Sequence, residues 1–336
     1  MIADTFGSIV LYLVLIFGLA WPLAARLAWP GPEKLLASAT LSTLGVFVIA
    51  WAVYVFALPR ASLWALPAAA VVGLGLGWRP LRETWRDAEV RGLAVAQLIV
   101  MLWCVGWLAL VVNYSGGGWT GDWFGHWQRA MFFLERGPRD ILFNGFDPVT
   151  SRPPLANLVT GAFMALTKID FAHYQLATTV LGSVAFLPAA LLARRFHLRQ
   201  GFGGHAGGRN CTALLAVLFM ASPMLVQNAT FAWTKLPAAF FTLAAVHYFL
   251  RAGERESRGA GLWCAATLAA ALLAHYSAGA VCGCDRHRVD RPRLGSATRG
   301  RLVARDCRGG CSRGDRARHV VRLGARGVWR ARNVSH

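Results

Sequence analysis

Residues 93–112 read LAVAQLIVMLWCVGWLALVV, an apolar run of 20 residues without a charged side chain. An α-helix of this length spans about 30 Å, which is the thickness of the hydrocarbon core of a bilayer. Inside lipid a helix also satisfies its own backbone hydrogen bonds. This stretch therefore predicts a membrane-spanning helix.

The composition of the whole chain agrees with a membrane protein. Of its 336 residues 56% are hydrophobic and only 15% are charged. Soluble domains are about 45–50% apolar and about 25% charged. The composition therefore excludes an ordinary cytosolic enzyme. It also excludes disorder over most of the chain, because disorder requires low hydrophobicity.

Nine apolar stretches precede residue 281 and predict an all-α polytopic fold with about eight spans. The stretches are 7–28, 36–57, 63–78, 93–112, 155–167, 174–193, 212–227, 232–250 and 260–280. The short stretch 155–167 follows Pro153 and Pro154, and we interpret it as a dipping or interfacial helix. Only Asp4 precedes the first stretch, without a basic region, so an uncleaved helix is predicted instead of a signal peptide.

Arginines between the stretches predict the orientation, because cytoplasmic loops of membrane proteins are enriched in Lys and Arg. The predicted cytoplasmic loops are 79–91, 194–209 and 251–258. The segments predicted on the outer face are 113–153, 228–235 and 275–277. Two full crossings within residues 155–193 would instead move the last two outer segments to the cytoplasmic side.

Residues 281–336 form a second predicted region, an Arg-rich disordered tail. They hold 15 Arg and 4 Asp, a net charge of +11, whereas residues 1–280 carry +8. A zinc site and a basic arm for nucleic acid or lipid headgroups are two alternatives. The C-x-C and C-x3-C spacings differ, however, from the C-x2-C pairs of common zinc modules. We expect neither a metal site nor a nucleic-acid partner.

Out-of-frame translation of a GC-rich gene is the hypothesis that we favour for the tail. Such a frame yields Arg, Gly, Ala and Pro, because their codons are GC-rich. Shifted by one base, a permitted back-translation of residues 280–291 encodes RYAVAIAIAWI, which would continue a membrane helix. The transmembrane domain is accordingly expected to cover residues 1–280, and the printed chain to be truncated.

The outer loop 113–153 carries the first candidate site residues. Asp122, His126 and Arg129 are spaced i, i+4, i+7, which places them on one face of a helix. The aromatic residues around them are Trp119, Trp123, Phe124 and Trp127. Aromatic rings beside a carboxylate suit a sugar site, since the rings stack on the sugar and the carboxylate accepts from its hydroxyls. An aromatic belt at the membrane interface is the alternative.

Each polar residue of this loop has a functional and a structural interpretation. Asp122 is a candidate general base for an acceptor hydroxyl, or it caps a helix that begins near Trp123. His126 is a candidate for binding phosphate or relaying a proton, or it lies at the interface. Arg129 and Arg152 match phosphate geometry, or they anchor the loop to lipid headgroups.

The other two outer segments add three candidates for substrate binding. Lys235 opens an apolar stretch beside Trp233. It binds a phosphate in the functional interpretation, or it snorkels to the membrane surface. His275 and Tyr276 end an Ala/Leu-rich stretch, although tyrosine is ordinary at membrane interfaces.

In this order the motifs resemble the GT-C superfamily of multi-spanning glycosyltransferases. The motifs are Asp122 amid tryptophans, Arg152-Pro153-Pro154-Leu155, Trp233-Thr234-Lys235 and His275-Tyr276-Ser277. Residues 93–280 are similar to the family of protein O-mannosyltransferases, aminoarabinose transferases and rhizobial core galacturonosyltransferases. The chain departs from many members by Trp123, where they have Glu, and by four stretches before the loop instead of one.

The resemblance implies a GT-C-like fold and a sugar donor linked to polyprenyl phosphate, without a further cofactor. It also implies a lipid, glycan or protein acceptor outside the bacterial cytoplasmic membrane, and Asp122 as the base. The sequence thus predicts a membrane glycosyltransferase. An inactive truncated membrane protein and a lipid-linked sugar transporter or flippase are the alternatives. A transporter requires polar residues at mid-membrane depth, of which the stretches hold few.

Overall fold

The computed structural model describes residues 2–110, 120–138, 140–143, 145, 147–199, 205–254 and 259–279. Most of this described part is helical, as the sequence predicts. Its β-structure is one short antiparallel pair in which Leu142 pairs with Pro148 and Phe143 with Asp147. The predicted Arg-rich tail, residues 281–336, lies outside the described residues.

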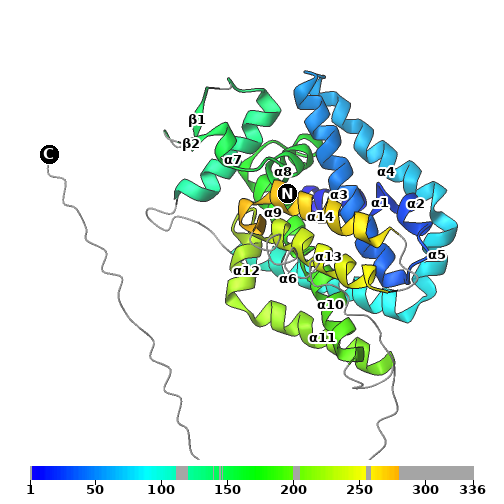
Figure 1. Ribbon diagram of the computed structural model, residues 1–336. Coiled ribbons are helices and arrows are strands. Elements are labelled where there is room, and N and C mark those ends of the chain that lie inside the picture. Colours follow the sequence, from blue (N-terminus) through cyan, green and yellow to red (C-terminus); the bar gives the residue numbers. More distant parts are fainter. Residues whose placement is uncertain are drawn as a thin grey trace, which may run out of the picture. The chain divides into compact units, whose positions relative to one another are not determined.

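The elements follow the apolar stretches with shifted ends (Figure 1). Before the outer loop lie α1 (Ile2–Gly18), α2 (Trp21–Ala25), α3 (Gly31–Val55), η1 (Arg60–Trp64), α4 (Ala65–Leu76), α5 (Trp78–Arg86) and α6 (Ala88–Leu110). The loop region contains α7 (Thr120–Glu135), β1 (Leu142–Phe143), β2 (Asp147–Pro148) and η3 (Val149–Ser151). After it come α8 (Leu155–Leu166), α9 (Phe171–Ser183), α10 (Phe186–Arg199), α11 (His205–Ala221), α12 (Pro223–Thr230), α13 (Lys235–Ala252), α14 (Ala260–Ala274) and η4 (Tyr276–Ala278).

Three helical segments in the described part of the chain are long and apolar enough to cross a membrane. They are Gly31–Val55, Ala88–Leu110 and Phe171–His197, which joins α9 to α10. The number rises to five if each of two bent pairs, α4 with α5 and α11 with α12, forms one span. The structure thus supports a helical membrane protein, while the predicted eight spans exceed what helix length and composition show.

Prolines and a glycine explain why several predicted spans are broken. Pro22 stands in the first turn of α2 and separates it from α1, because proline cannot continue the backbone hydrogen bonds of a preceding helix. Pro223 likewise begins α12 after a bend of 73°. Gly77 lies at the 66° bend between α4 and α5. The stretch after Pro154 forms α8, a separate helix of 12 residues, which is too short to span a bilayer.

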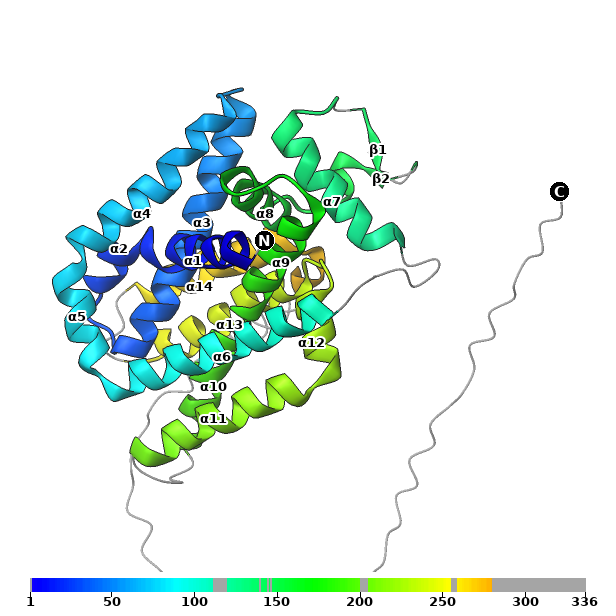
Figure 2. The same cartoon turned by 180° about the vertical axis from the view of Figure 1, so that it is seen from behind.

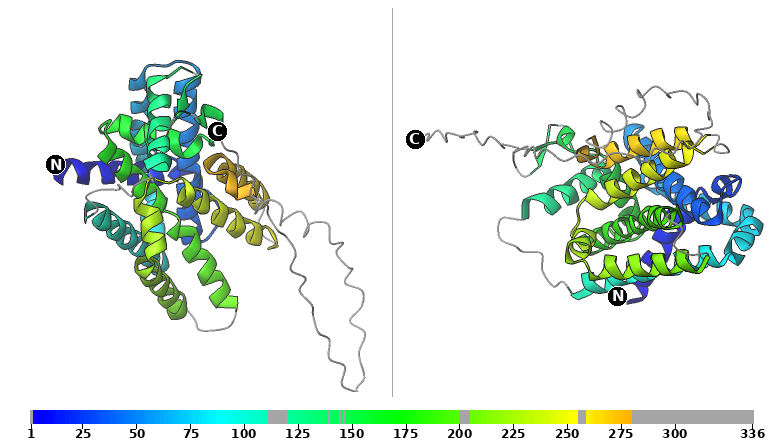
Figure 3. Two further views of the ribbon diagram at one scale, coloured as in Figure 1. Left: turned by 90° about the vertical axis from the view of Figure 1, so that its left-hand side faces the viewer. Right: turned by 60° about the horizontal axis from the view of Figure 1, so that its bottom comes forward.

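The helices pack through small and aromatic residues and leave apolar faces exposed. In the core, Tyr12 of α1 stacks on Phe163 of α8 with ring centroids 4.7 Å apart. Helix α13 lies beside α14, and α11 lies beside α6 (Figures 2 and 3). On outward faces, Leu76, Leu110 and Leu218 are more than half exposed. Apolar surface of this kind marks contact with lipid or with another protein.

Among the residues that the structure describes, two groups of polar contacts lie toward the two ends of α13. Arg194 contacts Glu89 and Arg251 contacts Glu33, each at 2.5 Å, and Arg195 pairs with Glu254. These pairs link segments near the predicted cytoplasmic side. The predicted outer segments meet separately, where Arg152 contacts both Asp122 and Tyr276. The assignment of these two groups to the two sides of a membrane stays a prediction.

Candidate functional site

Helix α7 presents Asp122, His126 and Arg129 on one face, as their spacing predicts. The helix begins at Thr120, so Asp122 stands inside the first turn and is not the residue that caps the helix. A carboxylate in a first turn is favoured by the helix dipole. The Asp122 side chain is 41% exposed, whereas His126 and Arg129 are buried at 3%. One helix face therefore combines an accessible carboxylate with two enclosed groups.

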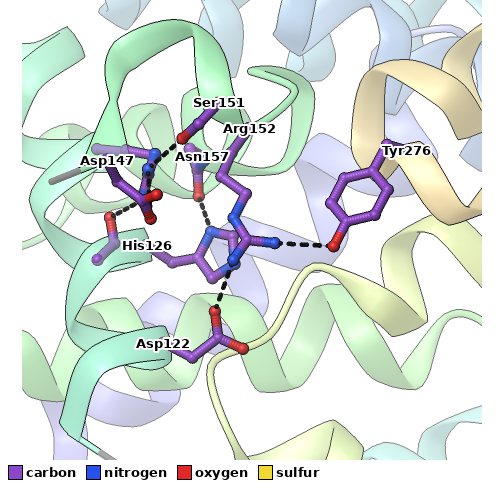
Figure 4. Close-up of polar contacts among 9 residues, drawn as sticks. Asp122, His126, Asp147, Ser151, Arg152, Asn157 and Tyr276 are labelled. Carbon is purple, nitrogen blue, oxygen red and sulfur yellow. Dashed lines mark hydrogen bonds and ion pairs between the residues drawn. The ribbon is translucent and has the colours of Figure 1, made fainter. Parts of the chain in front are cut away.

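Arg152 connects Asp122 to Tyr276, which lies in the segment after α14 (Figure 4). Its backbone is extended, as expected for a residue that precedes a proline. One guanidinium nitrogen, Nη2, lies 3.4 Å from Asp122 Oδ1, and Nη1 donates to the Tyr276 hydroxyl at 3.2 Å. The guanidinium carbon also lies 5.6 Å from the centre of the Tyr276 ring. Arg152 therefore holds α7 and the segment after α14 at one site.

His275 ends α14 through a local cap. Its Nδ1 accepts from the Ser277 backbone N–H at 3.2 Å and lies 2.8 Å from the Ser277 hydroxyl. The neutral ring therefore carries its proton on Nε2. Burial lowers the pKa of His275, Arg152 and Lys235 lower it further, and Asp122 opposes them. His275 is consequently neutral at pH 7, and its charged neighbours belong to one electrostatic group.

Lys235 adds a second cation to this group. It is the first residue of α13 and is exposed. Its ammonium lies 3.6 Å from the centre of the Trp233 ring, a cation–π contact. Within the residues that the structure describes, no carboxylate pairs with this ammonium. The lysine therefore retains hydrogen-bond donors for an anionic ligand.

His126 has a structural partner that the sequence did not reveal. Its Nδ1 lies 3.2 Å from the amide oxygen of Asn157 on α8. That oxygen only accepts, so Nδ1 carries the proton. Burial lowers the pKa of His126 to about 4, although Asp122 raises it. A neutral imidazole does not attract phosphate by charge, so the geometry favours a positioning role between α7 and α8.

Arg129 is engaged by the protein itself, which argues against the predicted phosphate contact. Its guanidinium donates to the Gly125 carbonyl at 3.0 Å and to the Ser151 hydroxyl at 2.8 Å, and it lies 3.4 Å from Asp147. The ring of Phe143 lies 4.6 Å from the guanidinium carbon. Arg129 thus fastens the β1–β2 hairpin to α7. Sequence spacing alone gave no signal for Asp147 or Ser151.

The residues that remain as a candidate site combine a proton acceptor with two cations. An accessible carboxylate accepts a proton, and the cations beside it stabilise an anion. Asp122, Arg152, Lys235 and the pair His275–Tyr276 come from four separate segments of the chain. Among the described residues, no group of three or more His, Cys, Asp or Glu side chains is arranged to hold a metal ion.

No protein-family model, curated protein or solved structure matches this chain. The similarity to glycosyltransferases therefore rests on the sequence motifs quoted above.

Proposed function

We propose that this chain is a membrane glycosyltransferase of the GT-C type, acting on a sugar linked to polyprenyl phosphate. The observation that supports it best is the Asp122–Arg152–Tyr276 contact, which joins three of the predicted motifs. An exposed proton acceptor then stands beside cations suited to a departing phosphate. These are the two requirements of direct glycosyl transfer to a hydroxyl.

In the proposed reaction Asp122 accepts the proton of the acceptor hydroxyl as its oxygen attacks the anomeric carbon. The bond between that carbon and the phosphate oxygen breaks, and the lipid phosphate leaves with the electron pair. The products are an inverted glycoside, polyprenyl phosphate and protonated Asp122. Lys235 and Arg152 stabilise the negative charge that grows on the phosphate.

Arg152 has a double role in this proposal. Without substrate it neutralises Asp122 across 3.4 Å. A bound phosphate offers its guanidinium a better partner, because Arg forks match phosphate oxygens. Donor binding would then release the Asp122 carboxylate to accept a proton. The hydroxyl of Tyr276 keeps the guanidinium in place during this exchange.

The proposed placement in the membrane follows the predicted topology. The site lies on the outer face of a bacterial cytoplasmic membrane, in a fold of about eight spans, with α8 as the dipping helix. In support, α8 is short and buried along nearly all of its length. It also supplies Asn157, which contacts the buried His126 of α7. The acceptor is a lipid, glycan or protein hydroxyl outside the membrane.

Transfer by the full chain tests this function directly. The purified protein in lipid nanodiscs is incubated with polyprenyl phosphates that carry radiolabelled sugars, with and without an acceptor-containing envelope extract. Release of polyprenyl phosphate and labelling of the acceptor are measured. Wild type and Asp140→Asn, a matched change at an exposed position of the same loop, should transfer sugar, and Asp122→Asn should not.

Three results would count against the proposal in different ways. Full transfer by Asp122→Asn would remove Asp122 from the reaction but leave the activity. A correctly inserted wild-type protein that consumes none of the donors would favour an inactive membrane protein. For the same protein in sealed proteoliposomes, movement of the donor across the bilayer without cleavage would favour a flippase.

A further inference from the structure

Helix α5 lies among the predicted cytoplasmic loops. The group of Asp122, Arg152 and Tyr276 belongs to the predicted outer segments, at the opposite end. Helix α5 follows α4 after a bend of 66°. Trp21, which is 1% exposed, fixes this bend by donating from its indole nitrogen to the Gly77 carbonyl at 3.0 Å. A Cβ at residue 77 would lie 2.4 Å from the same ring, so the close approach requires glycine.

Two different stripes run along α5. Trp78, Leu81 and Trp85 follow each other at i, i+3, i+7, a spacing that aligns them on one face. Arg79, Arg82 and Arg86 have the same spacing, one residue further on. No residue of this helix is buried, and the two tryptophans are 60% and 46% exposed. Such a short amphipathic helix with Trp and Arg is typical of a membrane interface.

The apolar stripe and two of the three arginines of the other stripe line a cavity of about 540 Å³, which is open to solvent. Its lining is Trp78, Leu81, Arg82, Trp85, Arg86 and Arg91. Arg91 belongs to α6 and donates to the carbonyls of Trp85 and Arg86 at 3.0 and 2.6 Å. These bonds fix the end of α5 against α6. The cavity is therefore a formed feature with three arginines and no carboxylate in its lining.

The arginines of this cavity differ from the other basic residues near the same end. Arg194, Arg195 and Arg251 each contact a glutamate. Arg82 and Arg86 pair with no carboxylate among the residues that the structure describes, and both are exposed. Two unpaired guanidinium groups beside two tryptophans match an anion attached to an apolar body. A phosphodiester at a membrane surface has this chemistry.

We propose that α5 and Arg91 bind the headgroup of an anionic phospholipid on the cytoplasmic side of the membrane. Arg82 and Arg86 contact the phosphate, while Trp78 and Trp85 lie beside the glycerol and the first acyl carbons. The inference does not depend on glycosyl transfer. It would give this end of the protein a lipid requirement.

Lipid-dependent stabilisation of the full chain in detergent tests the proposal. Melting temperature is followed at low ionic strength while phosphatidylglycerol, phosphatidylcholine or inorganic phosphate is added. Phosphatidylglycerol should stabilise the wild type most. The amount needed for half of the effect should rise about fivefold for Arg82→Gln or Arg86→Gln and about 25-fold for the double variant.

Arg79→Gln is the matched control, because it removes the same charge from the same helix outside the cavity. It should keep the wild-type response to phosphatidylglycerol. A loss equal to that of Arg82→Gln would mean a diffuse electrostatic effect and overturn the site. Equal stabilisation by phosphatidylcholine, or by inorganic phosphate, would overturn the anionic lipid as its ligand. Glutamine has helix propensity similar to arginine, so α5 is expected to persist in each variant.

Discussion

The two ends of α13 each carry one cation, in opposite situations. Lys235 at the first turn is exposed and contacts the Trp233 ring. Arg251, about 24 Å away along the helix axis, is buried between Glu33 at 2.5 Å and the ring of Trp29 at 5.0 Å. One charge is already neutralised inside the protein, and the other is available to a ligand. A positive charge alone therefore does not identify a binding site. The hydrogen-bond donors of the cation must also be without a protein partner.

The same contrast holds for the carboxylates at the two ends. The Glu33 side chain is 12% exposed and that of Asp122 is 41% exposed. Removing one partner of a buried pair leaves an uncompensated charge in a poorly solvated place, which strongly destabilises a protein. The Asp122–Arg152 pair is only partly buried, so removing one partner costs less, because water reaches the charge that remains. We therefore expect the Glu33–Arg251 pair, called the inner pair, to control stability. The Asp122–Arg152 pair, called the outer pair, should control function.

Asp122→Asn should produce the largest functional effect. If Asp122 is the base, the rate of sugar transfer should fall by about 10²–10⁴-fold. The melting temperature should fall only slightly, because this ion pair is partly exposed to water and exposed pairs contribute about 0–1 kcal/mol. Initial rates and thermal unfolding in the same detergent measure both quantities. If Asp122→Asn lowered the melting temperature as far as Glu33→Gln does, the two ion pairs would not differ in their contribution to stability.

Glu33→Gln should produce the largest loss of stability. The variant leaves the buried Arg251 guanidinium with Glu254, 3.9 Å away, as its remaining carboxylate, and the free energy of unfolding should fall by about 3 kcal/mol. Denaturant unfolding in detergent measures the loss. The double variant Glu33→Gln/Arg251→Met should recover part of it, since no unpaired charge remains. Sugar transfer per folded molecule should stay at the wild-type level, in contrast to Asp122→Asn.

The free energy of unfolding should depend on pH through His126, which is buried beside the candidate site. The folded-state pKa of His126 is about 4, below the value of about 6.5 expected in the unfolded chain. Between these values the unfolded state binds more protons, so stability rises with pH and is fully present above about pH 6.5. Lowering the pH from 7 to 5 should cost about 2 kcal/mol through this residue.

Thermal unfolding of wild type and His126→Gln at pH 7 and pH 5 isolates this contribution. The wild type should lose more stability than the variant, because Gln does not titrate. An identical loss in both proteins would show that His126 is protonated or exposed, contrary to its burial.

Tyr276→Phe should give the smallest of these effects. It removes the hydroxyl that accepts from Arg152 but keeps the ring beside the guanidinium. One such hydrogen bond contributes about 0.5–1.5 kcal/mol, so the KM for the donor should rise by about two- to tenfold. The melting temperature should change little, because Tyr276 is 59% exposed and water can replace the lost hydrogen bond. Steady-state kinetics with a varied donor concentration measure the effect, and an unchanged KM would separate Tyr276 from donor binding.

Local patterns in the sequence determined much of the fold. Uncharged runs of about 20 residues predicted helices at α3 and α6, because length and composition are properties of one segment. The i, i+4, i+7 spacing placed Asp122, His126 and Arg129 on one helix face for the same reason. Helix breaks at Pro22 and Pro223 were also present as local signals. Their effect on the number of long helices became clear only in the structure.

Only the tertiary structure decided which of the candidates form a site. Arg129 is bound by Ser151 and Asp147, and His126 by Asn157. Arg152 meets Tyr276 across 124 positions of the sequence. Periodicity shows the direction in which a side chain leaves its own helix, but its partner depends on how distant helices pack. The sequence by itself therefore determined a helical membrane protein with polar loops, and packing decided which of their charges stay available to a ligand.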